Sequence, residues 1–266
     1  GEQSGHLGRV LEQLADDLEA QQALRAKLLG AALYPAVVSL VALAIVVFLM
    51  TSVVPQVAGV FAGTQRQLPA LTVGMLAISD AVRQWGWLML LVLVMGLVGF
   101  RMALRQSAFR LRFDAAWLRL PIVGRLARGY NSTRFAATLA MLTAAGVPIL
   151  KALQAAADTL SNQALRADAL EALVRVREGA PLGTALTQNA RFPGLLGMFA
   201  KLGEQTGQLP LMLQRAAQQL SADVQRRAMA LATVLEPLLI VAMGGMVMVI
   251  VLAVLMPIMQ LNQWVK

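Results

Sequence analysis

The sequence GEQTGQLP occupies residues 203–210, and a near copy, GEQSGHLG, occupies residues 1–8. Aligned without a gap, the stretches 1–57 and 203–259 share glycines, leucines and prolines along their whole length, which indicates an internal repeat. The repeat predicts one unit used twice: a turn, a connecting helix and a membrane span. Its key residues are Gly1, Glu2, Gly5 and Pro35 in the first copy and Gly203, Glu204, Gly207, Glu236 and Pro237 in the second.

The glycines and prolines of the second copy suit a turn between two helices. Gly203 and Gly207 are expected to take the positive φ values found at helix C-termini, and Pro210 suits the first turn of the next helix. Glu204, between the two glycines, is expected to have a positional role. Pro237, like Pro35 in the first copy, removes a backbone donor, so we expect a kink or an interruption where each helix enters the membrane.

The composition is that of a membrane protein. Hydrophobic residues make up 58% of the 266 residues and charged residues 14%, whereas soluble domains are about 45–50% apolar and about 25% charged. Long runs without a charge are sufficient to cross a bilayer as helices, which satisfy their own backbone hydrogen bonds. The three predicted transmembrane helices built on these runs are residues 36–54, 85–103 and 236–259.

The basic residues predict the orientation of these helices. Seventeen of the 23 Lys and Arg residues lie between residues 101 and 235, and only two lie in the loop 55–84. Because short segments that flank a span keep Lys and Arg in the cytoplasm, residues 1–35 and 104–235 are expected to be cytoplasmic. The loop 55–84 and the tail 260–266 are then periplasmic. Topology and anionic lipid account for the basic charge, so nucleic-acid binding is not expected.

The segment 104–235 is expected to fold as an antiparallel helical bundle, which makes the chain an all-α polytopic membrane protein. Apolar residues recur at helical spacing through most of it, and no convincing strand pattern is present. The clearest stripe, behind the expected helix caps Asn131 and Ser132, is formed by Phe135, Leu139 and Leu142. Residues 1–35 are interpreted as the remnant of a similar first bundle, with its earlier helices expected upstream.

Four further motifs are distinctive: RLPIVGRL at 119–126, RFAATLAMLTAAGVPILKAL at 134–153, VREGAPLGTAL at 176–186 and LEPLLIVAMGG at 235–245. Together with the repeat motif, they resemble those of the GspF/PilC family, the inner-membrane platform proteins of bacterial type II secretion and type IV pilus machines. The ending PIMQLNQWV at 257–265 is more similar to the secretion branch. The resemblance implies a non-enzymatic platform whose partners are a cytoplasmic secretion ATPase, bitopic inner-membrane assembly proteins and pseudopilins. A type IV pilus platform is the alternative within the family.

The sequence favours neither an enzyme nor a metalloprotein. It contains no cysteine and a single histidine, His6, so neither a metal site nor a cofactor is expected, and without a Walker A motif any ATP must be hydrolysed by another chain. Glu236 beside Pro237 leaves a small transporter or channel as a weaker alternative, because acids within spans are often functional. Small residues in the spans, such as Gly96 and Gly245, suit either packing among the three spans or a homo-oligomer.

Overall fold

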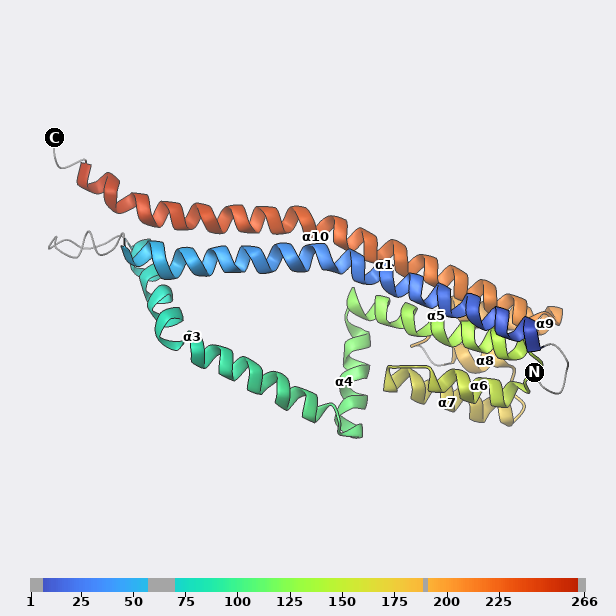
Figure 1. The fold of residues 1–266 in the computed structure, drawn as a ribbon. Coiled ribbons are helices and arrows are strands. Elements are labelled where there is room, and N and C mark those ends of the chain that lie inside the picture. The colour runs from blue at the N-terminus through green and yellow to red at the C-terminus, as the bar shows by residue number, and fades with distance from the viewer. Residues whose placement is uncertain (1–6, 57–69, 189–190, 263–266) are drawn as a thin grey trace. The chain divides into compact units, whose positions relative to one another are not determined.

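The computed structural model describes residues 7–56, 70–188 and 191–262, which are almost entirely helical (Figure 1). They divide into two compact units that share two long helices. The bundle unit comprises residues 1–30 and 102–230, and the membrane unit comprises residues 31–101 and 231–266. No strand occurs in the part of the chain that the structure describes, and this confirms the all-α prediction.

Three long helices account for the predicted membrane spans. Helix α1 (Leu7–Phe48) continues into a π-helical turn, η1 (Leu49–Val53), and is followed by α3 (Ala70–Ala103) and, at the end of the chain, by α10 (Leu209–Asn262). Within the described residues, three helical stretches are long and apolar enough to cross a membrane: Gln22–Gln56, Ala70–Ala103 and Leu209–Met256. The first two contain the predicted spans 36–54 and 85–103, and the third covers residues 236–256 of the predicted span 236–259. All three begin before the predicted spans, because the connecting helices are continuous with the spans.

The bundle unit is built from six shorter helices and the first parts of α1 and α10. The helices are α4 (Ser107–Arg119), α5 (Val123–Ala144), α6 (Ile149–Asp158), α7 (Gln163–Arg177), α8 (Leu182–Thr187) and α9 (Gly194–Thr206). Each packs on the next along the chain from α4 to α9, and α4 also packs on α7. Short connections between amphipathic helices favour this arrangement of sequential neighbours.

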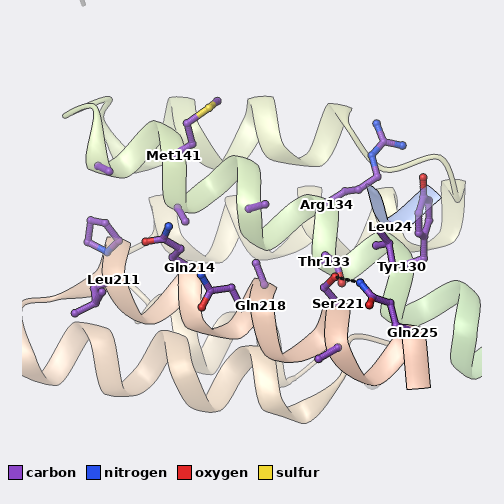
Figure 2. Close-up of a pocket in the computed structure, with 16 residues that line it drawn as sticks. Leu24, Tyr130, Thr133, Arg134, Met141, Leu211, Gln214, Gln218, Ser221 and Gln225 are labelled. Carbon is purple, nitrogen blue, oxygen red and sulfur yellow. Dashed lines mark hydrogen bonds between the residues drawn. The ribbon is translucent and has the colours of Figure 1, made fainter. Parts of the chain in front are cut away.

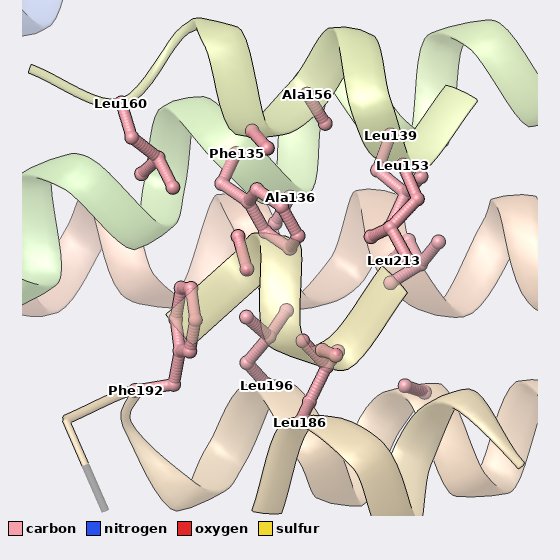
Figure 3. Packing of buried hydrophobic residues seen from close by; sticks show 14 of the residues in the cluster. Phe135, Ala136, Leu139, Leu153, Ala156, Leu160, Leu186, Phe192, Leu196 and Leu213 are labelled. Atoms are coloured by element: carbon pink, nitrogen blue, oxygen red, sulfur yellow. The ribbon is translucent and has the colours of Figure 1, made fainter. Parts of the chain in front are cut away.

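Leucine and alanine side chains from almost every helix of the bundle unit meet in a single core (Figure 3). The rings of Phe135 and Phe192 pack against each other within it, with their centroids 5.3 Å apart. Each buried leucine or phenylalanine contributes about 1.5–3 kcal/mol by leaving water, so the core accounts for the stability of the bundle. Its fully buried leucines include Leu139, Leu153, Leu165, Leu186, Leu196 and Leu213.

The prediction that Asn131 and Ser132 cap a helix is wrong, because both lie inside α5 and are buried. Asn131 Oδ1 instead accepts hydrogen bonds from the backbone N and the hydroxyl of Ser161, at 3.1 and 2.9 Å. Its Nδ2 donates to the Ala127 carbonyl, at 2.9 Å. The residue therefore ties α5 to the turn before α7. In the sequence alone, a buried asparagine that hydrogen-bonds to another element cannot be distinguished from an asparagine that caps a helix.

Candidate functional site

The acid of the second repeat motif binds the start of another helix. Glu204 lies near the end of α9, and its two carboxylate oxygens accept hydrogen bonds from the backbone N–H groups of Leu182, at 2.5 Å, and Gly183, at 3.0 Å. These are the first two residues of α8, whose N-cap, Pro181, makes no side-chain cap bond. The first N–H groups of a helix have no partner within it, and a carboxylate is a favourable one.

The two glycines of the same motif have different roles. Gly207 ends α9 in the left-handed region, with φ +67°, as expected for a glycine C-cap. Gly203 does not have the predicted positive φ and lies within α9. Its side-chain position is instead occupied by the next helix, because a Cβ there would lie 2.8 Å from the Cα of Leu209. Gly203 is therefore required by close packing and not by backbone conformation.

A third glycine brings α8 equally close to α9. A Cβ at Gly183 would lie 2.6 Å from the backbone N of Lys201, a distance that real Cβ atoms do not adopt. Because Gly183 also donates to Glu204, the bond to the carboxylate and the close approach of the two helices support one another. The motif thus joins α8, α9 and α10 at a single point in the bundle unit.

Glu204→Gln is expected to weaken this junction without abolishing it. Glutamine keeps the size of the side chain but has one acceptor oxygen, so its amide nitrogen faces a backbone donor of α8. We expect a loss of about 1 kcal/mol, the typical contribution of one hydrogen bond, and more rapid amide exchange in α8. Hydrogen exchange of the purified chain in detergent would measure this. The neighbouring change Gln205→Glu should leave α8 unaffected, and equal effects of the two changes would contradict the assigned role of Glu204.

In the membrane unit, equivalent residues of the two repeats face each other. The Tyr34 hydroxyl donates to a carboxylate oxygen of Glu236, at 3.2 Å, and the two residues are separated by 202 positions, the spacing of the repeat. Each stands one residue before a repeat proline, Pro35 or Pro237. Both helices continue through their prolines without a break in helical structure. Glu236 therefore has a partner supplied by the other copy of the same unit.

A second pair of repeat prolines leaves two backbone carbonyl groups without their usual donors. In the π-helical turn the Val54 N–H bonds to Leu49 O, so the next carbonyl, that of Met50, would need a donor at residue 55, which is a proline. In α10, the carbonyl of Ala253 would need a donor at residue 257, which is also a proline. Proline has no N–H, and a carbonyl left unpaired in a membrane costs free energy.

Helix α3 supplies both missing donors through side-chain hydroxyls. Ser79 Oγ donates to Met50 O at 2.5 Å, and Thr72 Oγ1 donates to Ala253 O at 2.8 Å. Both hydroxyl residues are buried, and they lie seven residues apart, on one face of α3 with Met75 between them. We call these two bonds the hydroxyl clamp. It connects α3 to the proline ends of both repeat copies, and the sequence prediction missed it.

A groove of about 650 Å³ runs along the bundle unit between α5 and the first part of α10, with Leu24 of α1 at one end (Figure 2). Small side chains on both helices leave the space open, among them Ala137 and Ala140 on α5 and Ala217 on α10. Polar side chains such as Arg134, Gln214 and Gln218 line its sides. Of the repeat residues singled out in the sequence, Pro210 at the start of α10 lines the groove.

Ionisable side chains do not gather into a recognisable catalytic or metal-binding set among the described residues. No group of three or more His, Asp or Glu side chains there is suited to hold a metal ion. Among the acids whose side chains the structure describes, Asp168 is the most buried; it pairs with Arg191, and burial raises its pKa despite the attraction of that arginine. Gly1, Glu2, Gly5 and His6 lie outside the described residues, so the first repeat motif stays a prediction.

Comparison with known proteins assigns the family. A family sequence model described as Type II secretion system (T2SS), protein F, matches residues 1–55 and 135–257. The chain belongs to the type II secretion system protein F family. Both matched segments end at equivalent prolines of the repeat, Pro55 and Pro257. The family resemblance seen in the sequence is thereby confirmed.

Members of the family are similar to the chain over its whole length. The type II secretion system protein F of Pseudomonas aeruginosa is 43% identical over 265 residues, which is 100% of this chain and 65% of that protein. The protein F of Vibrio cholerae is 40% identical, over 98% of this chain and 64% of that protein. The type IV pilus assembly protein PilC of Thermus thermophilus is 33% identical, over 98% of this chain and 64% of that protein.

Proposed function

We propose that the protein containing this chain is a non-enzymatic platform in the bacterial inner membrane, which links a cytoplasmic secretion ATPase to pseudopilus assembly and protein export. The observation that carries the proposal is membership of the type II secretion system protein F family along the whole chain. Three helices suited to cross a membrane and a separate helical bundle unit agree with a scaffold role. Bitopic inner-membrane proteins and pseudopilins are the other proposed partners.

The secretion branch is favoured over the pilus branch by sequence identity. Three proteins named type II secretion system protein F are 43%, 41% and 40% identical to this chain, and a fourth is 34% identical. Pilus or fimbrial assembly proteins named PilC are 33%, 32% and 35% identical. The transporter alternative rested on Glu236, which the structure pairs with Tyr34 of the other repeat copy. That bond supports a positional role for the acid.

Deletion of the full-length gene tests the proposed role directly. We expect export of the machine's substrate proteins to stop and to return when the intact gene is supplied, while the purified protein hydrolyses no ATP. Normal export combined with loss of surface pili would assign the protein to the pilus branch. Normal export combined with loss of a solute or ion flux would support a transporter and contradict the proposal.

The proposed orientation places the bundle unit in the cytoplasm and the start of α3 in the periplasm. Because the chain has no cysteine, single cysteines report topology without background. A cysteine at Ala70, an exposed residue at the start of α3, should react with an impermeant maleimide in intact spheroplasts. One at Ala155, an exposed residue of α6, should react only after lysis. Labelling of the Ala155 site in sealed cells would show that the orientation is inverted.

A further inference from the structure

Helix α4 carries a stripe of three aromatic side chains along its length. Phe109, Phe113 and Trp117 are spaced four residues apart, so they lie on one face of the helix. The rings of Phe109 and Phe113 are stacked with centroids 6.5 Å apart, and those of Phe113 and Trp117 are tilted at 5.7 Å. Phe109 and Trp117 are 41% and 40% exposed, and Phe113 between them is partly buried, so the two ends of the stripe lie at the surface of the bundle unit.

The opposite face of α4 packs on the bundle. Leu118 is buried there, and α4 contacts α5 and α7. Asp114, the only acid of the helix, also points to this side, since its carboxylate accepts a hydrogen bond from the backbone N of Gln163, the first residue of α7, at 2.7 Å. The orientation of α4 is therefore fixed, with its negative charge directed inward.

Arginines flank the aromatic stripe on the outward side. Arg112 and Arg119 lie along one edge and Arg110 along the other, and all three are exposed. Arg110 also reaches the Ser161 carbonyl, at 3.4 Å, so Arg112 and Arg119 are the better positions to test. An aromatic centre with cationic edges is the pattern of helices that lie in a membrane interface, where aromatic rings enter the headgroup region and arginines bind phosphate.

The chain connects the start of α4 directly to a helix suited to span a membrane. Helix α3 is apolar enough to span a bilayer and ends at Ala103, and α4 begins at Ser107. Three intervening residues extend over about 10 Å at most. We propose that the outward face of α4 is a docking surface for anionic phospholipid headgroups in the leaflet next to the bundle unit. Anionic lipid fits better than neutral lipid because the exposed charges of α4 are all positive.

A fluorescent probe on this face tests the proposal. A single cysteine at Ala116, an exposed residue between the aromatic stripe and Arg112, is labelled with an environment-sensitive dye in the whole chain, reconstituted in nanodiscs. In discs of phosphatidylcholine with phosphatidylglycerol we expect blue-shifted emission and protection from iodide, compared with discs of phosphatidylcholine alone. High salt should reverse both changes, since screening weakens attraction to the headgroups. A probe at Ala155, on α6, should respond to neither lipid.

Substitution of two arginines should release the outward face of α4 from the lipid headgroups. Each basic residue near an anionic surface contributes about 1 kcal/mol, so Arg112→Gln with Arg119→Gln is expected to lower the docked-to-undocked ratio about 30-fold. Arg177→Gln with Arg215→Gln, at exposed positions of α7 and α10, is the control with the same net charge and should leave the Ala116 probe docked.

Identical Ala116 spectra in the two lipids would overturn the proposal. So would protection of the Ala116 probe that requires an added acidic protein, because the face would then bind a protein and not the membrane. If the double variant folds poorly, the salt dependence of the Ala116 probe in the chain with its original arginines still tests the proposal.

Discussion

Gly203→Val is expected to be the most damaging single change in the repeat motif. Its Cβ would meet the Cα of Leu209 at 2.8 Å and the Cβ of Met212 at 3.1 Å, so the start of α10 would have to move away from α9. Overpacking costs roughly 1–3 kcal/mol and occasionally more. For a clash with backbone we expect about 3 kcal/mol, a large part of the stability of a typical domain. For a unit of this size we expect the thermal unfolding midpoint of the bundle to fall by about 10 °C.

The same substitution elsewhere in α9 provides the control. A Cβ at Gly194, the first residue of the helix, would meet no atom within 4 Å, so Gly194→Val should shift the midpoint by only a few degrees. Circular dichroism of the purified chain in detergent measures both variants, and trypsin sensitivity of the bundle reports local loosening. If the two valine variants melted together, the close approach of α9 and α10 would not be what requires glycine at residue 203.

Removing the hydroxyl clamp, by Thr72→Val with Ser79→Ala, is expected to loosen the start of α3 from η1 and α10. Each change keeps the local packing close to its original shape but leaves a buried carbonyl without a donor. Hydrogen bonds between membrane helices contribute about 0.6 kcal/mol on average and up to about 1.7 kcal/mol, so the pair contributes roughly 1–3 kcal/mol. Amide exchange over residues 70–79 should accelerate about tenfold or more in nanodiscs.

Two neighbouring residues offer the matched control. The Thr51 hydroxyl bonds within its own helix, to the carbonyls of Val47 and Phe48. Thr51→Val with Ser52→Ala therefore makes the same chemical change without breaking a bond to α3. Exchange over residues 70–79 should remain at its original rate in this variant. An acceleration equal to that of the clamp variant would mean that the region responds to lost hydroxyls in general.

Much of the fold was predictable because the repeat and the apolar runs are local signals. The ungapped match between the copies led to the prolines, and the structure places the residues before two of them, Tyr34 and Glu236, in contact. The three spans follow from hydrophobicity alone. Helix spacing predicted a bundle, and Phe135 and Leu139 of the predicted apolar stripe are buried in its core.

The specific contacts were not predictable, because each depends on a residue far away in the sequence. In the sequence, Gly203 resembles a turn glycine, and only the structure shows that the backbone of α10 packs against it. Glu204 has no obvious partner, since its two donors lie on α8, about twenty residues earlier. Thr72 and Ser79 read as ordinary small polar residues. The clamp could have been predicted from two observations together. Two hydroxyl residues lie two turns apart on one helix, and prolines in other helices leave backbone carbonyls without hydrogen-bond donors.

Co-purification of the intact protein tests the central claim most directly. The full-length protein is extracted in mild detergent from cells that express the neighbouring genes, and its partners are identified at low and high salt. We expect the secretion ATPase and bitopic inner-membrane proteins to be recovered at low salt and to be reduced at high salt, because the bundle segment carries excess basic charge. Recovery of the protein without these components under both conditions, with export unaffected by its loss, would contradict the platform function.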